Sequence, residues 1–227
     1  MNPTTQDSLP AALGEPEPSR LARWRSRVGY QGLSLGIVCG AAVLLLMLGD
    51  LATREQIAAS RQQDQLAMLR QVLPDALYDN DPLGEAFTLE DARLGQVQVY
   101  PASNSGELTA LVFQISPIGW AGPITLLVSV ERGGAILGVR VLGHKETPGL
   151  ADKIEVARSD WITRFDGLSL ANTPLPAWGV KKDGGQFDQF AGATITPRAI
   201  VRAVLQTLQV QQEQGDAFAE KIQEARP

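Results

Sequence analysis

The chain lacks most of the residues and motifs that mark familiar classes of enzyme. It has one cysteine and one histidine among 227 residues, too few ligands for a typical zinc site. It contains no Gly-x-Gly-x-x-Gly fingerprint, no P-loop, no Cys-x-x-Cys cluster and no chain order typical of a Ser/His/Asp triad. These absences predict no metal site and no catalytic residue in the chain itself. They also predict that it binds neither NAD nor an iron–sulfur cluster.

Positive charge is scarce and unevenly placed. There are 20 Lys and Arg residues against 25 Asp and Glu residues, for a net charge of −5. This balance excludes the broad basic face of a nucleic-acid-binding protein. Four arginines nevertheless fall within the eight positions from Arg20 to Arg27, immediately before an uncharged run. Residues 1–27, proline-rich and polar before that cluster, are predicted to be a disordered tail that ends in it.

The long stretch without charge runs from Val28 to Gly49. Its 22 residues would form roughly 33 Å of helix, enough to cross a hydrocarbon core of about 30 Å. The alternatives are a buried core helix, which is rarely uncharged for so long, and a cleaved signal peptide, whose apolar part is typically about 7 to 15 residues. No Ala-x-Ala cleavage pattern precedes Asp50. We therefore predict an uncleaved transmembrane helix over residues 28–49.

The residues that flank this run predict its orientation. The arginine cluster precedes it, whereas Asp50 follows it directly and Arg54 is balanced by Glu55. By the positive-inside rule the N-terminus stays in the cytoplasm and everything after residue 50 crosses the membrane. In a bacterium this places a single-pass protein in the inner membrane with its C-terminal domain in the periplasm. Because Cys39 lies within the run, the exported domain can form no internal disulfide.

The rest of the chain predicts one α+β domain. Residues 50–95 are expected to be a helical connector and domain entry, in which Ala52–Leu73 forms a helix that Pro74 stops. Residues 96–212 are expected to form the compact domain, with a mainly antiparallel sheet flanked by helices, and residues 213–227 a polar C-terminal tail. The expected strands have alternating or continuous apolar character: Gln96–Tyr100, Leu108–Ile115, Ile124–Val130 and Ala135–Leu142, the last two joined by a hairpin at Glu131–Gly134. Short helices are expected around Leu150–Val156 and near Trp161, and a long one from Pro197.

The most informative segment is Asp188–Pro197, with the sequence DQFAGATITP. Gly192 and Ala193 are small enough to let backbone amides approach a ligand. Thr196 is a preferred N-cap residue and Pro197 suits the first helical position. A Thr194 hydroxyl near a helix N-terminus would therefore lie beside unpaired N–H groups and the positive end of the helix dipole, where a phosphate is favoured. On residues alone, a capped helix after a tight turn is the simpler interpretation.

A second motif, His144-Lys145-Glu146-Thr147-Pro148-Gly149-Leu150, follows the last expected strand. Thr147-Pro148-Gly149 predicts a turn, because Pro fixes its φ and Gly takes positive values. A third segment contains Lys181 and Lys182, which on sequence alone are ordinary solvated turn residues.

Together these motifs resemble the FMN-binding subunits of Rnf-type electron-transport complexes and of the sodium-translocating NADH:quinone reductase. In that family an Asp opens a motif whose Thr, after Gly-Ala, carries FMN through a phosphoester bond. Asp188, Gly192, Ala193 and Thr194 match, whereas Ala191 replaces the usual hydroxyl residue. The HKETPGL segment resembles the element that lies against the flavin in the same domain. Order and length are most similar to the G subunit of the Rnf-type complex.

The resemblance implies a function and a set of site residues. The chain would carry electrons on a covalent FMN at Thr194, as one redox link of a translocase that couples ferredoxin- or NADH-linked electron flow to ion movement. Its partners would be membrane lipid, the other membrane subunits of the complex and a periplasmic flavin transferase that uses FAD and releases AMP. A lysine near the flavin, Lys181 in preference to Lys182, would stabilise the anionic reduced ring. The remaining flavin-binding residues would be Gly192, Ala193, Thr196, Asp188, Glu146, Thr147, Gly149 and Leu150.

Three alternatives remain open at this point. The chain could be a periplasmic binding module with the same fold and no covalent flavin, or an assembly subunit in which the Gly-Ala-Thr segment only caps a helix. It could also be the equivalent subunit of the quinone reductase.

Overall fold

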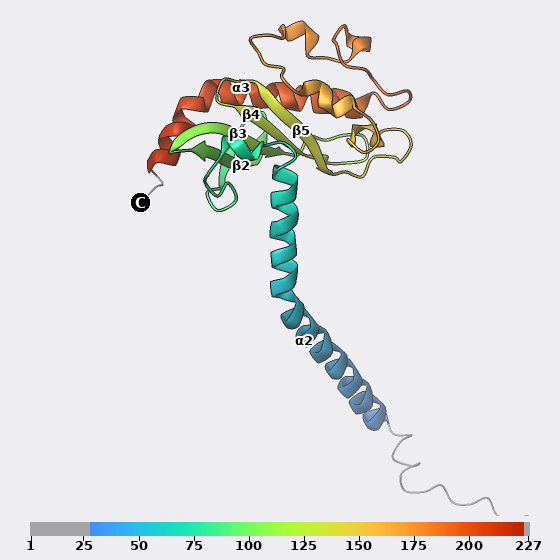
Figure 1. The fold of residues 1–227 in the computed structure, drawn as a ribbon. Helices are drawn as coiled ribbons and strands as arrows, with labels where there is room; N and C mark the ends of the chain where they lie inside the picture. Colours follow the sequence, from blue (N-terminus) through green and yellow to red (C-terminus); the bar gives the residue numbers. More distant parts are fainter. Residues whose placement is uncertain (1–27, 225–227) are drawn as a thin grey trace, which may run out of the picture. The chain divides into compact units, whose positions relative to one another are not determined.

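The computed structural model describes residues 28–224, apart from the side chains of residues 28, 55–63, 216 and 219–224. The disordered tail predicted for residues 1–27 lies outside the described residues. The chain divides into two units, Met1–Ala59 and Ser60–Pro227. Helix α2, Val28–Leu69, begins in the first unit and ends in the second (Figure 1).

The described part of the first unit is an apolar helical segment. Gly29–Arg54 comprises 26 residues of α2, with a mean hydropathy of 2.3 in its most apolar part. Large side chains such as Leu46 and Met47 are 75% and 60% exposed. The segment is long and apolar enough to cross a membrane, and it includes the predicted span almost entirely. Cys39 lies in it and is exposed.

Helix α2 ends at Leu69, earlier than the predicted stop at Leu73. The backbone N–H groups of Gln71 and Val72 donate to carbonyls three residues back, at 3.1 and 3.0 Å, so the chain tightens into turns before it reaches Pro74. This tightening directs Leu69, Val72 and Leu73 into the protein, where they are at most 3% exposed. Burial of these three side chains therefore overrides the continuation of the helix.

The second unit is built on a five-stranded antiparallel sheet in which each strand pairs with the next along the chain. The strands are β1 (Phe87–Asp91), β2 (Gly95–Asn104), β3 (Glu107–Ile115), β4 (Thr125–Glu131) and β5 (Ile136–Gly143). The predicted antiparallel sheet is confirmed, with its four expected strands in place. The edge strand β1 was missed: it has only five residues, and two of them are acidic.

Each face of the sheet is covered by a different part of the chain, as the two-residue period of a strand requires. On one face, Leu69, Val72 and Leu73 pack against Tyr100, Ala102, Ala110, Val112 and Leu127. The chain approaches closely there because β5 has Gly138, whose missing Cβ would lie 3.3 Å from Val72 Cα.

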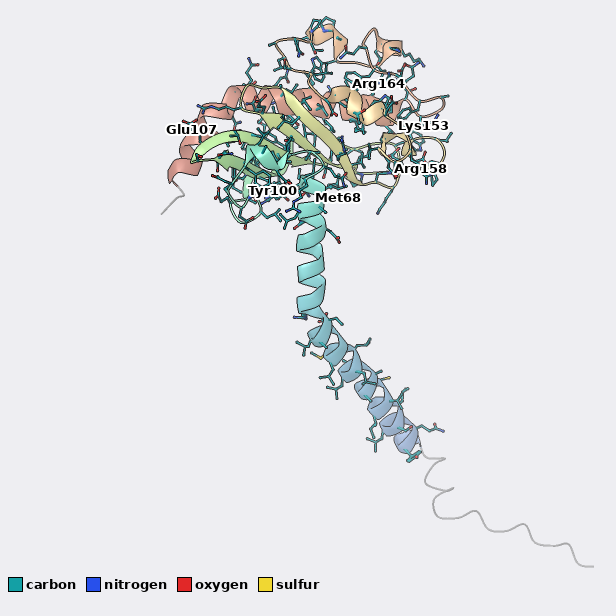
Figure 2. The ribbon with its side chains drawn as sticks, viewed as in Figure 1. Met68, Tyr100, Glu107, Lys153, Arg158 and Arg164 are labelled. Carbon is teal, nitrogen blue, oxygen red and sulfur yellow. The ribbon has the colours of Figure 1, made fainter. Side chains whose placement is uncertain are left out.

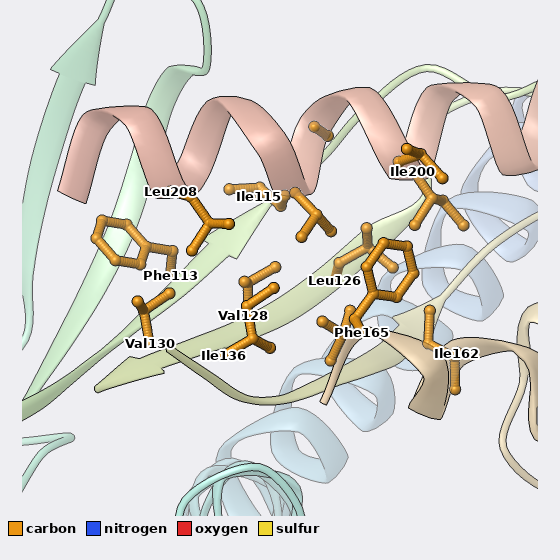
Figure 3. Close-up of a cluster of buried hydrophobic side chains, with 14 of the residues drawn as sticks. Phe113, Ile115, Leu126, Val128, Val130, Ile136, Ile162, Phe165, Ile200 and Leu208 are labelled. Atoms are coloured by element: carbon orange, nitrogen blue, oxygen red, sulfur yellow. The ribbon is translucent and has the colours of Figure 1, made fainter. Parts of the chain in front are cut away.

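The other face carries the larger core and helix α3, Ile195–Glu224 (Figures 1 and 3). Strand residues Phe113, Ile115, Leu126, Val128 and Ile136 face helix residues such as Ile200 and Leu208, all at most 2% exposed. The helix continues through residues 213–224, where a polar tail was expected, because Phe218 is 3% exposed and packs at 5.9 Å from Phe87, ring centroid to ring centroid. The sheet and its covering helix thus extend beyond residues 96–212 at both ends.

Residues 144–194 connect β5 to α3 mainly through turns and short 3-10 helices: η2 (Asp152–Ile154), η3 (Trp161–Phe165), η4 (Leu175–Ala177) and η5 (Lys181–Asp183). The predicted short helices near Leu150 and Trp161 correspond to η2 and η3. An aromatic cluster holds this segment together, with ring centroids 4.5 Å apart for Phe165–Phe187 and 5.3 Å for Trp161–Phe190. Such pairs each contribute about 0.5–1.5 kcal/mol of stability beyond their burial. They therefore hold this loop-rich segment in a defined conformation. Lys153, Arg158 and Arg164 lie on its surface (Figure 2).

Candidate functional site

A cavity of about 150 Å³ lies at the first turn of α3. Three segments that are distant in sequence line it: the β3–β4 loop, the HKETPGL motif with the residue after it, and the turn into α3. The lining residues are Trp120, Glu146, Thr147, Leu150, Ala151, Gly192, Ala193, Thr194 and Ile195. Six of these were predicted as site residues, so the fold brings the two sequence motifs to one place.

The turn before α3 has the conformation that its glycine permits. Ala193 N donates to Phe190 O at 3.1 Å, and Gly192 at the third position has φ +78°. A positive φ there is typical of a type II turn and costs an L-residue with a side chain. Ala191 occupies the second position and is exposed.

Thr194, rather than Thr196, occupies the N-cap position of the helix. Arg198 N donates to Thr194 O at 3.3 Å, the first bond of the helical pattern, and the helix begins at Ile195. The prediction that Thr196 is the N-cap and Pro197 the first helical residue is therefore wrong by two residues. The reason is a tertiary contact: Thr196 is 0% exposed and donates its hydroxyl to Glu146 Oε2 at 2.5 Å.

Thr194 is half-buried and lines the cavity. No described residue makes a hydrogen bond with its hydroxyl, whereas the Thr196 hydroxyl two residues later is fully engaged. Pro197 has no N–H, and the backbone N–H groups of Ile195 and Thr196 belong to the first turn, where helices leave donors unpaired. A free hydroxyl and unpaired donors thus lie together at the positive end of a 30-residue helix.

The Thr147–Leu150 turn contributes Thr147 and Leu150 to the cavity lining. Leu150 N donates to Thr147 O at 3.2 Å and Gly149 has φ +78°, as the Pro-Gly sequence predicted. His144 stabilises the residues that precede the turn: its Nδ1 accepts from Glu146 N at 3.0 Å, and its Nε2 lies 2.7 Å from Glu155 Oε1. Because Nδ1 must accept, the proton of the neutral ring is on Nε2. Both ring nitrogens of His144 therefore have partners within the protein, and neither makes a hydrogen bond with Thr194.

Glu146 is the buried acid of the site, with 4% of its surface exposed. One oxygen accepts from Ala121 N at 3.0 Å and the other accepts from the Thr196 hydroxyl. Two donors of this kind are what a buried carboxylate requires. Gly119 passes directly over it, since a Cβ at that position would lie 2.5 Å from Glu146 Oε1.

Trp120 lines the cavity and was not predicted from the sequence. It is 70% exposed, between Gly119 and Gly122 at the tip of the β3–β4 loop. Ile195, which is 42% exposed, adds apolar surface to the same cavity, and Ile118, which is 69% exposed, lies in the same loop as Trp120. A large aromatic residue flanked by glycines in a loop was the available signal, because such a residue has no place in a core and large exposed apolar patches mark binding sites.

Asp188 and Lys181 lie outside the cavity lining. Asp188 instead joins two 3-10 helices: Lys181 Nζ lies 2.6 Å from Oδ1, and Arg164 pairs with Oδ2. The hydrogen bond from Lys181, followed by that from Arg164, holds the pKa of Asp188 below its usual value. Trp161 Nε1 also donates to Asp188 O at 2.8 Å. The ion pairs and the backbone bond fix the segment that leads into the Phe190–Ala193 turn. Lys182 does not line the cavity either.

Comparisons with known proteins match the part of the chain that forms this cavity. Residues 119–209, from the Trp120 loop into α3, match the model of the FMN-binding domain family. Over 230 aligned residues the chain is 59% identical to a Stutzerimonas stutzeri protein named as the G subunit of an ion-translocating oxidoreductase complex, with 100% of both chains covered. This chain belongs to the family of those G subunits. A Cereibacter sphaeroides member is 48% identical over 190 residues (83% of this chain, 87% of that one), and a Pseudomonas aeruginosa member 45% over 181 residues (78% and 85%).

The family assignment made from the motifs is thereby confirmed, as is the FMN-binding domain. Among the described residues, no group of three or more His, Cys, Asp or Glu side chains is placed to hold a metal ion. The FMN-binding domain match, which covers residues 119–209, supports FMN as the cofactor of this chain.

Proposed function

We propose that this protein is the membrane-anchored flavoprotein subunit of an ion-translocating electron-transport complex and carries electrons on an FMN bound covalently to Thr194. The observation that carries the proposal is the free Thr194 hydroxyl at the start of α3, on the edge of a cavity built from both motifs. The bound FMN supplies the electron transfer, and the chain supplies attachment, position and electrostatics.

The residues at the cavity fit the two chemically different parts of FMN. The phosphate would lie at the N-terminus of α3, where the helix dipole favours an anion by about 0.3–1 kcal/mol. Trp120, Leu150 and Ile195 offer exposed apolar surface to the ring system. Because a contribution of that size from the dipole does not retain a small ligand permanently, a covalent bond is the better account of a resident flavin.

Attachment needs an external catalyst. An unactivated hydroxyl is a weak nucleophile, and no described histidine or carboxylate hydrogen-bonds Thr194. We propose that a flavin transferase presents FAD to it. Thr194 Oγ bonds to the phosphorus of the FMN half and its proton passes to solvent, while the bond from that phosphorus to the bridging oxygen breaks and AMP leaves with that oxygen. The turn at Phe190–Ala193 leaves Ala191 and Gly192 exposed, which keeps this approach open.

Orientation and surroundings complete the proposal. The arginine cluster before the Gly29–Arg54 segment supports a cytoplasmic N-terminus, with residues beyond 54 in the periplasm of a bacterial inner membrane. The other partners are membrane lipid and further membrane subunits of the complex. Asp188 and Lys181 serve to fix the segment before the attachment site.

A fusion of alkaline phosphatase after residue 60 tests the orientation and should be active. An inactive fusion with an active cytoplasmic reporter at the same position would overturn this topology.

Co-production with and without a flavin transferase tests the central part. After denaturing electrophoresis, only a covalent flavin still fluoresces with the protein band. We expect fluorescence with the transferase and none without it. A fluorescent band from purified apo-protein mixed with FAD alone would contradict the need for a catalyst. A dark band with active transferase would favour a binding module without covalent flavin.

A further inference from the structure

Two parts of the cavity lining come from segments that are far apart in the chain. Thr194 and Ile195 of the first α3 turn form one, and Trp120 of the β3–β4 loop forms another. The two are more than 70 residues apart in sequence, and the strand ladder of the sheet does not include either one.

The loop that carries Trp120 is held almost entirely by its own hydrogen bonds. Gly119 N donates to Gly122 O at 2.8 Å and Ile124 N donates to Pro117 O at 2.9 Å, which closes the loop as a small hairpin. Within the described residues, the one hydrogen bond that joins its tip to the rest of the protein runs from Ala121 N to Glu146 Oε1. Glu146 thus determines where the residue next to Trp120 lies.

The same carboxylate also reaches the helix. Its second oxygen accepts from Thr196, two residues after Thr194 and fully buried. Both carboxylate oxygens therefore accept from inside the protein, and Thr196 does not line the cavity. These contacts argue against a direct flavin contact by the Thr196 hydroxyl, which the sequence resemblance implied.

We propose that Glu146 and Thr196 are a positioning pair: one carboxylate joins the Trp120 loop to the first turn of α3 and so sets Thr194 opposite Trp120 for flavin attachment. The pair acts through these neighbours and not on the flavin. The role deepens the proposed function and rests on it for its kinetic part, while its structural part is measurable without flavin.

The main test replaces Thr196 in the full-length protein. Thr196→Val keeps the side-chain shape and removes the hydroxyl, and Thr196→Ser keeps the hydroxyl. With purified transferase and FAD, we expect Thr196→Val to lower kcat at least about tenfold with an unchanged KM for the protein substrate, because misplacement of a reacting group slows reaction more than binding. Thr196→Ser should stay within about twofold of wild type. In apo-protein, the Ala121 amide should exchange with solvent faster in Thr196→Val only, although Thr196 does not touch that residue.

Two further variants separate positioning from other roles. Glu146→Gln can bond Ala121 through its carbonyl and Thr196 through its amide, so we expect flavin attachment within about threefold of wild type; loss of attachment in this folded variant would assign Glu146 a role through its charge and overturn the proposal. Asp183→Asn removes an exposed ion pair to Arg198 in the same helical turn and should leave the rate unchanged.

The outcomes remain distinguishable from failure of the proposed function. If the wild-type chain accepts no FMN, the proposed attachment fails, and the pair is then judged by amide exchange. Unaltered Ala121 exchange in folded Thr196→Val, or equal attachment rates in Thr196→Val and wild type, overturns the positioning pair. Should Thr196→Val fail to fold, the Glu146→Gln result decides.

Discussion

Helix α3 borders two cavities, and the larger one is not the candidate site. The cavity near its later turns measures about 260 Å³ and is bordered by the β4–β5 hairpin, Ser169–Ala171 and Leu208–Gly215. The cavity at its start measures about 150 Å³. In the larger one two polar side chains make hydrogen bonds within the protein: Gln211 Nε2 donates to Arg132 O, and Ser169 Oγ accepts from Asn172 N.

The smaller cavity differs in chemistry. It has a hydroxyl that makes no hydrogen bond with any described residue, the positive end of a long helix and an aromatic side chain that is 70% exposed. Both sequence motifs also meet there. Volume therefore does not locate this site; an available reactive atom and exposed apolar surface do.

The largest expected effect comes from Thr194→Ala. The variant removes the oxygen that forms the phosphoester, so covalent flavin should fall to zero while the protein still folds. Thr207→Ala is the matched control in the same helix, near the larger cavity, where the hydroxyl is buried and donates to Ala203 O at 2.9 Å. In-gel fluorescence after denaturation measures both. Covalent flavin retained in Thr194→Ala would show that the smaller cavity is not distinguished from the larger one by an attachment residue at Thr194.

Leu208→Ala should affect stability without affecting attachment. Leu208 is 1% exposed and lines the larger cavity, so the variant should lower the free energy of unfolding by about 2–5 kcal/mol. The flavin content of the folded fraction should match wild type, as measured by chemical denaturation and by absorbance of the purified protein. A proportionate loss of covalent flavin would mean that the two cavities are coupled.

Trp120→Ala should change the surroundings of the flavin with little effect on the stability of the protein. Because Trp120 is 70% exposed, its truncation should change the free energy of unfolding by no more than about 0.5 kcal/mol. The flavin of the loaded protein should become more accessible to a soluble quencher such as iodide. Unchanged quenching would show that the ring does not lie against Trp120.

The smallest effect concerns pH. Lys181 and Arg164 lower the pKa of Asp188 from 3.8, so this carboxylate stabilises the folded state above its unfolded pKa, and the contribution disappears as pH falls through the lowered folded value. The difference in Tm between wild type and Asp188→Asn should therefore be present at about pH 6 and shrink toward about pH 3. It should also decrease in high salt, since the pair is exposed. A difference independent of pH would contradict this account.

Much of the fold followed from local patterns. The uncharged run, the alternation in β2–β5 and the hairpin glycines are each properties of short segments, and so are the Thr147–Leu150 and Phe190–Ala193 turns. Six of the ten predicted site residues line one cavity, and they come from the two motifs that the resemblance rested on.

The remainder depended on contacts that no local pattern contains. The start of α3 was misplaced because Thr196 is a good N-cap by itself, yet a carboxylate 50 residues earlier takes its hydroxyl. Likewise, Asp188 was expected at the flavin; it does not line the cavity, and it pairs with Lys181 and Arg164. Helix α3 also extends past residue 213, because one aromatic side chain there, Phe218, is buried in the core.

Peptide mapping of the loaded protein tests the central claim most directly. Trypsin should release residues 183–198, which contain Thr194 and Thr196 together. Fragmentation of this peptide by tandem mass spectrometry assigns the FMN phosphoester to one of them. We predict that the modification lies on Thr194 alone. A modification on Thr196, on another residue, or on none in protein matured with the transferase would contradict the account.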